Sequence, residues 1–234
     1  MSRVHVIVFV AVATLLGACH ATRHAKSVEP SGFLAEYKNL LQPGGEGEAL
    51  LRYRAPDVNW ASYKKIFLAP FTIWVGPDTK LSPEGQKNLE VLVDNFYNLV
   101  YTKLSKDYEM VDKAGPHTMY IKAAITHGEA SVVVATTVTK IIPQARMLNT
   151  LWTFATDKPA FSGEASIEVI VRDAETGKVL AAGADRRFGG TKLLDSEVIN
   201  SWGDVKNSLD LWADASVWRL CVLRGEKNCV KPKA

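Results

Sequence analysis

The spacing of apolar residues predicts two long helices. Within residues 82–104, apolar positions recur every three or four residues, as on one face of a helix; they are Leu89, Leu92, Val93, Phe96, Leu99, Val100 and Leu104. Ser82 and Pro83 suit the N-cap and the first turn of this helix. A similar pattern predicts a second helix over residues 203–223, which Gly225 ends.

Apolar runs and alternation of apolar with polar residues predict five strands. They cover residues 66–75, 108–111, 119–126, 161–173 and 178–188. The first is apolar apart from Thr72, as in a buried central strand, and is interrupted near Pro70. The last two form a hairpin, because Gly177 suits the left-handed position of the turn between them.

Residues 31–65 precede these elements and are irregular but too apolar for a solvated linker. We expect this segment, the N-terminal wrap, to pack over the sheet. The order of elements predicts an α/β fold of the α+β type: a mixed sheet of about five strands, with two long helices on one face, preceded by the wrap. Residues 31–234 would form a single globular domain.

Residues 131–154 are apolar, contain many threonines and are broken by Pro143. Two interpretations stay open. The segment folds back and fills the core, or part of it contacts a second subunit, a partner protein or the lipid surface. The residues that would form such an interface are Ile141, Ile142, Leu151 and Trp152.

The first nineteen residues have the features of an export signal. A basic start at Arg3 precedes an apolar run, and the run ends in Leu16-Gly17-Ala18-Cys19. This junction resembles the bacterial lipoprotein signal, in which the cysteine is acylated and becomes the new N-terminus. A plain secretory signal would not need Cys19, and a transmembrane anchor would need about 20 apolar residues.

We therefore expect residues 1–18 to be removed and Cys19 to carry lipid. Residues 19–30 would form a flexible tether between the lipid and the fold. His20 stands where lipoproteins kept in the inner membrane tend to carry aspartate. The resemblance therefore implies a lipid-anchored protein of the outer membrane that faces the periplasm.

Composition narrows the classes of partner. Apolar residues make up 47% of the chain, as in ordinary globular proteins, and the net charge is only +3. The basic residues are scattered, so nucleic acid is not an expected partner. The expected partners are the membrane, through the lipid anchor, and an envelope protein or a second copy of the chain.

Cys221 and Cys229 remain once Cys19 is assigned to lipid. In an oxidising compartment this pair predicts a disulfide, which in the chain-entropy model contributes roughly 2.5 kcal/mol. The alternative is two free thiols, one of them buried on the last helix.

Four passages together resemble a known family. They are Ser31-Gly32-Phe33-Leu34 with Tyr37 and Leu40; the Tyr53, Pro56 and Tyr63 positions of the wrap; Gly163-Glu164-Ala165 with Glu168; and Asp173, Thr176 and Gly177 leading to Asp185. They resemble the Gram-negative lipoproteins grouped as DUF 3313, a domain of unknown function. The resemblance implies an envelope location and no catalytic residue. A looser similarity, at the level of topology, is to the curli-secretion lipoprotein and the N-terminal domain of the Tol-system propeller protein.

The sequence contains no strong match to a known catalytic or cofactor-binding motif. No catalytic residue, metal ligand or cofactor is therefore predicted. Ser62 and Lys65 have the spacing of penicillin-binding enzymes but lack the partner motifs. Glu164 and Glu168 could stand about 5–9.5 Å apart, as in glycosidases, but acids on an exposed sheet face are usually solvated. The histidine pairs, His20 with His24 and His117 with His127, lack further ligands.

Two functional hypotheses follow. The first is a non-catalytic outer-membrane lipoprotein that acts as a binding or scaffold component. The alternative is a periplasmic hydrolase acting on an envelope polymer. A deep polar cleft with a strongly shifted carboxylate or histidine would favour the hydrolase. A shallow surface with a projecting apolar segment would favour the scaffold.

Overall fold

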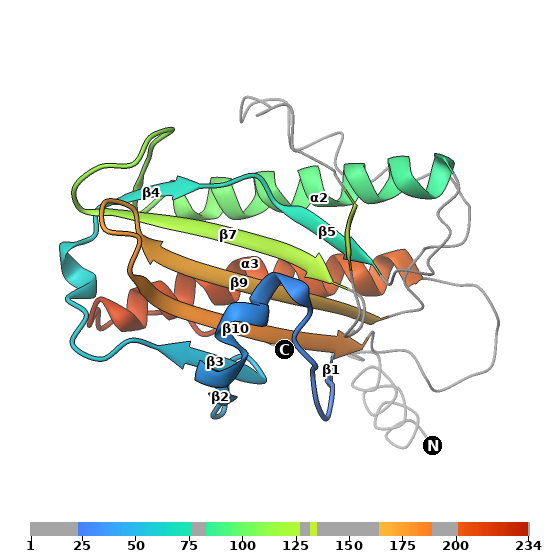
Figure 1. The fold of residues 1–234 in the computed structure, drawn as a ribbon, viewed down its shortest axis with the longest axis horizontal. Helices are drawn as coiled ribbons and strands as arrows, with labels where there is room; N and C mark the ends of the chain where they lie inside the picture. The colour runs from blue at the N-terminus through green and yellow to red at the C-terminus, as the bar shows by residue number, and fades with distance from the viewer. Residues whose placement is uncertain (1–22, 76–82, 127–131, 135–163, 189–200, 234) are drawn as a thin grey trace, which may run out of the picture.

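The protein is a mixed β-sheet with the two long helices on one face and the start of the N-terminal wrap on the other (Figure 1). A computed structural model describes residues 23–75, 83–126, 132–134, 164–188 and 201–233. The two long helices are α2 (Pro83–Leu104) and α3 (Ser201–Leu223), and both agree with the predicted helices. They pack against each other behind the sheet in the view of Figure 1.

The described strands form one sheet of ten members. They are β1 (Arg23–His24), β2 (Gln42–Pro43), β3 (Leu51–Arg54), β4 (Lys65–Leu68), β5 (Thr72–Val75), β6 (Glu109–Met110), β7 (Thr118–Thr126), β8 (Val132–Val134), β9 (Glu164–Asp173) and β10 (Val179–Phe188). Their order is β2-β3-β10-β9-β7-β4-β6; β1 also pairs with β10, and β5 joins β7 to β8. The sheet is mixed, because β9 is antiparallel to β7 whereas β4 and β5 are parallel to it.

The alternation within β9 assigns each residue to one face of the sheet. Ile167 and Val171 join the main core under the helices. Ile170 belongs to a smaller core with Val28 and Leu34, under the 3₁₀ helix η1 (Gly32–Leu40). The strand is therefore covered on both sides, and polar residues on either face are removed from water.

The sheet has more strands than the five predicted. The predicted strand at 66–75 is split into β4 and β5 around Pro70, which has no N–H to donate to a neighbouring strand. The wrap, expected to lie over the sheet, also supplies β2 and β3 at its edge. It contains a second 3₁₀ helix, η2 (Trp60–Ser62). The predicted fold class, a mixed sheet with the long helices on one face, is confirmed.

The segment predicted as a flexible tether, residues 19–30, is in large part attached to the domain. β1 pairs with Arg187 and Phe188 of β10, and the N–H of Ala25 donates to the Arg186 carbonyl at 2.9 Å. Val28 is buried in the smaller core. Backbone pairing at a sheet edge leaves no side-chain pattern, so the polar composition of this segment was misleading.

Several predicted features lie outside the described residues. They are the signal at residues 1–18, Cys19, His20, His127 and the interface candidates Ile141, Ile142, Leu151 and Trp152. Among the residues that the structure does describe, no helix has the length and hydropathy needed to cross a membrane.

Candidate functional site

Small side chains leave space between the sheet and the helices. The strand register aligns Arg52 of β3 with Gly183 of β10, Val169 of β9 and Ala123 of β7 in one row. In this row Gly183 and Ala123 offer almost no side chain. Ala49 covers Gly183, since a Cβ there would lie 3.5 Å from the Ala49 Cβ, whereas Ala123 and Val169 line space that a packed interior would fill with larger residues.

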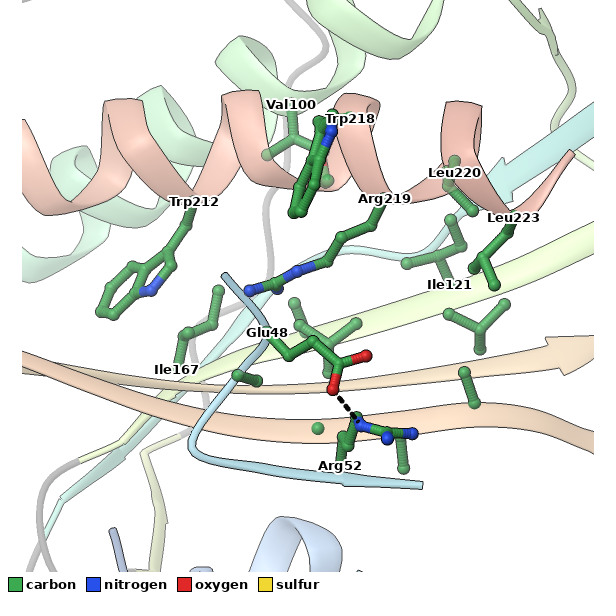
Figure 2. Close-up of a pocket in the computed structure, with 18 of the residues that line it drawn as sticks. Glu48, Arg52, Val100, Ile121, Ile167, Trp212, Trp218, Arg219, Leu220 and Leu223 are labelled. Carbon is green, nitrogen blue, oxygen red and sulfur yellow. Dashed lines mark ion pairs between the residues drawn. The ribbon is translucent and has the colours of Figure 1, made fainter. Parts of the chain in front are cut away.

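The resulting cavity has a volume of about 230 Å³ and a largely apolar lining (Figure 2). Its buried lining residues come from both helices, the wrap and the central strands; they include Trp60, Phe71, Phe96, Leu104, Ile121, Ile167, Trp212 and Leu220. The cavity therefore suits an apolar molecule better than a polar one.

Polar groups gather where the cavity reaches the surface. Val222 of α3 lines the cavity and is 50% exposed. Arg52 and Arg54 of β3 also line it, and their side chains are 39% and 45% exposed. We call this region, between β3 and the C-terminal half of α3, the mouth. It lies on the edge of the sheet that the sequence analysis did not recognise as strand.

Three arginines and one glutamate are the charged residues of the described lining: Arg52, Arg54, Arg219 and Glu48. Glu48 forms ion pairs with Arg52 and Arg54, and it accepts a hydrogen bond from the Gly45 N–H at 2.8 Å. Burial alone would raise the pKa of Glu48, but these donors hold that pKa below its usual value. The glutamate is therefore ionised, and the mouth keeps an excess of positive charge.

Arg219 lies between the mouth and the interior, on the face of α3 directed at the sheet (Figure 2). One Nη donates to the Gly47 carbonyl at 3.3 Å. Within the described part of the chain, its buried Nε has no hydrogen-bond partner. Burial lowers the pKa of Arg219, while Asp185 acts to raise it. The guanidinium thus carries a charge that its surroundings solvate incompletely.

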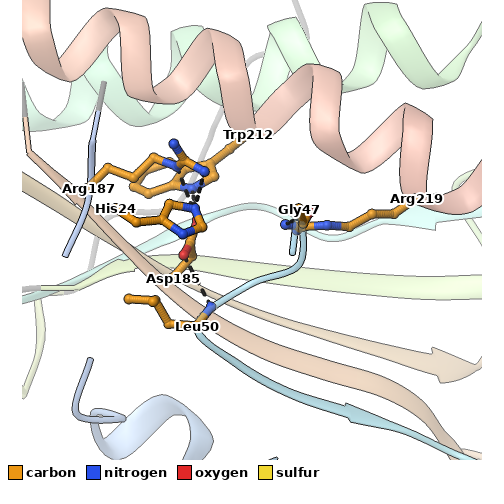
Figure 3. A network of polar contacts seen from close by, with 7 residues as sticks. All are labelled: His24, Gly47, Leu50, Asp185, Arg187, Trp212 and Arg219. Carbon is orange, nitrogen blue, oxygen red and sulfur yellow. Dashed lines mark hydrogen bonds and ion pairs between the residues drawn. The ribbon is translucent and has the colours of Figure 1, made fainter. Parts of the chain in front are cut away.

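A buried polar network borders the cavity at Trp212 (Figure 3). Asp185 is 2% exposed and accepts hydrogen bonds from Trp212 Nε1 at 2.7 Å and from Arg187 Nε at 3.3 Å. It also accepts one from the Leu50 N–H at 3.3 Å. The carboxylate therefore connects β10, α3 and the segment that leads into β3.

His24 of β1 completes this network. Its Nε2 lies 3.6 Å from Asp185 Oδ2 and contacts the Arg187 guanidinium. Burial lowers the pKa of His24, and Asp185 opposes that effect. Because the ring nitrogen faces an arginine, the histidine is engaged in holding β1 against β10. From its sequence, His24 has only the features of a metal ligand in a tether, and nothing in the local sequence signals this contact with Asp185 and Arg187.

Glu168 is fully buried, which corrects the expectation of a solvated acid on an open sheet face. Its neighbours across the sheet are Ala124 and Ala184, whose small side chains leave room for the start of η1. Glu168 Oε1 accepts a hydrogen bond from the Ser31 N–H at 2.5 Å. Burial raises the pKa of Glu168, and hydrogen bonds such as that from Ser31 oppose the rise.

A second contact of this kind joins the wrap to the β9–β10 turn. Asp173 Oδ1 accepts from the Thr176 N–H at 2.7 Å, and Oδ2 accepts from the Tyr63 hydroxyl at 2.8 Å. Burial and this hydrogen bond raise the pKa of Tyr63 to about 12. The passages that carried the family resemblance thus meet in space, Ser31 with Glu168 and Tyr63 with Asp173.

Cys221 and Cys229 form the predicted disulfide. It holds the tail after α3 beside the mouth, where Lys231 pairs with Glu46 at 3.2 Å and its Nζ lies 5.9 Å from the ring centre of Trp218. Gly47 makes this approach possible: its φ is +77°, and a Cβ there would lie 3.2 Å from the Trp218 ring.

The remaining sequence candidates are not brought together as a site. Ser62 donates to the Asn59 carbonyl at 2.7 Å, whereas Lys65 pairs with Glu109 at 3.6 Å. His117 has a φ of +57°, and its carbonyl accepts from the N–H groups of Lys64 and Lys65. In the described ranges, no three His, Cys, Asp or Glu side chains cluster in a way that could hold a metal ion.

Solved structures with a distant likeness to this chain include the following two. A PelC dodecamer from Paraburkholderia phytofirmans is 12% identical, with 69% of this chain and 92% of that chain covered and a TM-score of 0.31. A DUF4136 family protein from Bacteroides thetaiotaomicron is 15% identical, with 68% and 91% covered and a TM-score of 0.29. Neither carries an argument about function. No curated protein matches the chain at a significant level.

A family model described as a protein of unknown function, DUF3313, matches residues 29–216. The match runs from the start of the wrap into α3, and so it includes every passage on which the resemblance rested. The chain belongs to the DUF3313 family.

Proposed function

We propose that this protein is a non-catalytic lipoprotein of the outer membrane that faces the periplasm and binds an apolar molecule in the cavity between the sheet and α3. The observation that carries the proposal is the apolar cavity of about 230 Å³ with its mouth at β3. A cavity of about 150 Å³ lined by similar residues stays dry and binds benzene. This cavity is larger and opens to the surface.

The N-terminal sequence supports the membrane location. Cys19, at the end of the Leu16-Gly17-Ala18-Cys19 junction, is four residues before Arg23, where β1 begins. A chain spans at most roughly 3.6 Å per residue, so four residues reach about 14 Å. A lipid on Cys19 would therefore hold the domain close to the membrane surface.

The position of the shifted acids and bases supports binding rather than hydrolysis. Glu168 and His24 have shifted pKa values, but neither lines the cavity. Glu48 does line it, but its pKa is lowered and it is ion-paired with Arg52 and Arg54, which does not suit a general acid. Glu168 holds the start of η1, and His24 holds β1. A hydrolase would need such groups in reach of a substrate, so the alternative hypothesis gains no support from them.

An envelope protein or a second copy of the chain remains a proposed partner. The proposed interface is Ile141, Ile142, Leu151 and Trp152. Among the described residues, the exposed large apolar side chains are Leu40, Val91, Val222 and Val230. They lie on different segments, so the part of the chain that the structure describes gives no further argument for a large apolar interface.

The anchor is tested by replacing Cys19. We expect Cys19→Ala to abolish incorporation of labelled fatty acid and to release the protein from the membrane fraction. Continued labelling together with tight membrane association would contradict a lipid on this residue. Fractionation of the wild-type protein between inner and outer membranes tests the proposed location.

The binding function is tested with a neutral apolar dye, N-phenyl-1-naphthylamine, whose naphthyl rings, with about ten carbons, match the size of the cavity while its phenyl ring stays at the open mouth. Residues 19–234 with Cys19→Ala keep every described residue and carry no lipid. We expect saturable dye fluorescence that Val169→Phe weakens about ten-fold, because a bulkier side chain occupies the cavity. Val91→Phe, an equal change at a residue 39% exposed on α2, is the matched control. Absence of saturable binding, or an equal loss in both variants, would contradict the proposal.

A further inference from the structure

We infer that the ligand of the cavity is an amphiphile with a single acyl chain and an anionic head group. Its chain would lie in the apolar interior, and its head group would meet Arg219 and Arg54 at the mouth. The inference rests on the proposed binding function and adds the chemical class of the ligand. The apolar lining of the cavity is the argument for an acyl chain, and the arginines at the mouth are the argument for an anionic head group.

The volume limits the chain that fits inside. Scaled from a cavity of about 150 Å³ that holds the six carbons of benzene, about 230 Å³ holds roughly nine carbons. Phe71 and Phe96 line the cavity and are each 2% exposed, so they belong to its buried part. A straight chain extending from the mouth toward them buries one methylene after another, each contributing about 0.8 kcal/mol.

The charge of the mouth selects the head group. Glu48 already pairs with both Arg52 and Arg54, so one carboxylate faces two guanidinium groups. Arg219 adds a third positive charge on the opposite wall. An anionic group entering here replaces lost hydration of the arginines, whereas a cationic group meets repulsion. A neutral head group is neither attracted nor repelled by the charge of the mouth.

Arg219 provides the geometry. One Nη is held by the Gly47 carbonyl, and the covered Nε has no hydrogen-bond partner among the described residues. A guanidinium fixed at one nitrogen presents its remaining donors in a plane that matches a carboxylate or phosphate. A covered Nε without a partner is costly, and the negative charge of an anion bound beside the guanidinium offsets part of that cost. Carboxylate and phosphate share this chemistry, so both belong to the inferred class.

The test measures displacement of N-phenyl-1-naphthylamine from residues 19–234 with Cys19→Ala. The competitors are decanoate, decyl phosphate and 1-decanol, which share one chain length and differ in the head group. We expect at least one of the two anions to displace the dye at a concentration about ten-fold or more below that of decanol, the usual range for charge-assisted hydrogen bonds. Which anion competes better distinguishes a carboxylate from a phosphate ligand.

Variants at the mouth show whether the arginines cause the preference. We expect Arg219→Gln to reduce the anion-to-alcohol ratio to within about three-fold, and Arg219→Lys, which keeps the charge, to retain part of it. Arg54→Gln, at a more exposed position, gives an independent reading if Arg219→Gln is unstable. Lys113→Gln removes an exposed charge that does not line the cavity, and it should leave the ratio unchanged.

Two results would overturn the inference while leaving the proposed binding function intact. One is equal displacement by decanol and by both anions, which would describe an apolar site without head-group recognition. The other is an anion preference that persists in folded Arg219→Gln and Arg54→Gln. Failure of the dye to bind wild-type protein contradicts the proposed function itself, so the two failures are distinguishable.

Discussion

Three acids, the buried Glu168 and Asp185 and the half-buried Asp173, connect segments that are far apart in the chain. Glu168 of β9 binds the N–H of Ser31, and Asp173 at the end of the same strand binds Tyr63. Asp185 of β10 connects α3 and the start of β3. Each lies under a covering segment and satisfies donors that burial would otherwise leave unpaired, so their role is structural.

Replacing Asp185 tests this role. Asp185→Asn keeps the size of the side chain but removes the negative charge that compensates Arg187, which is 8% exposed. We expect a loss of about 3 kcal/mol in the free energy of unfolding, measured by urea denaturation. Asp214→Asn, which removes an ion pair whose aspartate is 51% exposed, should cost less than about 1 kcal/mol. Equal losses of unfolding free energy in the two variants would contradict a structural role for Asp185 that depends on its burial.

Glu168 should make stability depend on pH in a direction opposite to that of most acids. Burial raises its folded-state pKa above the usual 4.5, so the folded state holds the proton more tightly than the unfolded state. The free energy of unfolding contributed by this group is therefore greatest below 4.5 and is lost as pH rises through the raised pKa.

We expect this loss to disappear in Glu168→Gln, which cannot ionise. The measurement is the difference in unfolding free energy between variant and wild type, followed from about pH 4 upward. Glu175→Gln, at an exposed residue of the β9–β10 turn, is the control and should give a difference independent of pH. A difference for Glu168→Gln that stays constant, or that moves in favour of wild type as pH rises, would contradict the assignment.

At the scale of elements, the disulfide links the end of α3 to the tail that borders the mouth. The tail brings Lys231 to Glu46 and to the Trp218 ring. A small closed loop restricts the unfolded chain, which in the chain-entropy model contributes roughly 2.5 kcal/mol. The disulfide therefore both stabilises the end of α3 and holds the tail in place beside the mouth.

We expect Cys229→Ser to lower the free energy of unfolding by about 2 kcal/mol, read from urea denaturation under non-reducing conditions. Cys229 is the better position because it is more exposed than Cys221, which is 9% exposed. As a control, reductant should lower the stability of wild type and leave the variant unchanged. Two alkylatable thiols in the exported wild-type protein would contradict the disulfide.

The elements that sequence predicted well are those whose side chains follow a period. α2, α3, β7 and the β9–β10 hairpin each present one face to the main core, and that face repeats along the sequence. β1, β2 and β3 joined the sheet unforeseen, because short edge strands pair through the backbone and need no side-chain pattern.

The candidate site was harder to predict than the fold. Glu168 occupies the polar half of an alternating strand, as a solvated acid would, and only the segments that cover the two faces bury Glu168 and Asp185. The cavity depends on Ala123 and Val169 meeting in one row across adjacent strands. That alignment is a property of strand register, which the local sequence does not contain.

At the scale of the whole molecule, anchor, mouth and proposed interface belong to different parts of the chain. The proposed anchor precedes β1 by a few residues, and β1 shares one edge of β10 with β3, which borders the mouth. A lipid-anchored domain would thus hold this sheet edge near the membrane, where molecules with acyl chains are concentrated. The proposed interface, by contrast, falls in the segment between β8 and β9.

Ile141 and Ile142 decide whether that segment serves association. On the proposal, replacing both with serine in residues 19–234 with Cys19→Ala should leave the melting temperature nearly unchanged and reduce association measured by analytical ultracentrifugation. Ile125→Ser, at a residue 1% exposed in β7, shows the cost of a true core position and should lose roughly 2–5 kcal/mol. If the double variant loses as much stability and keeps its oligomeric state, the segment fills the core, and binding in the cavity is then the function left to test.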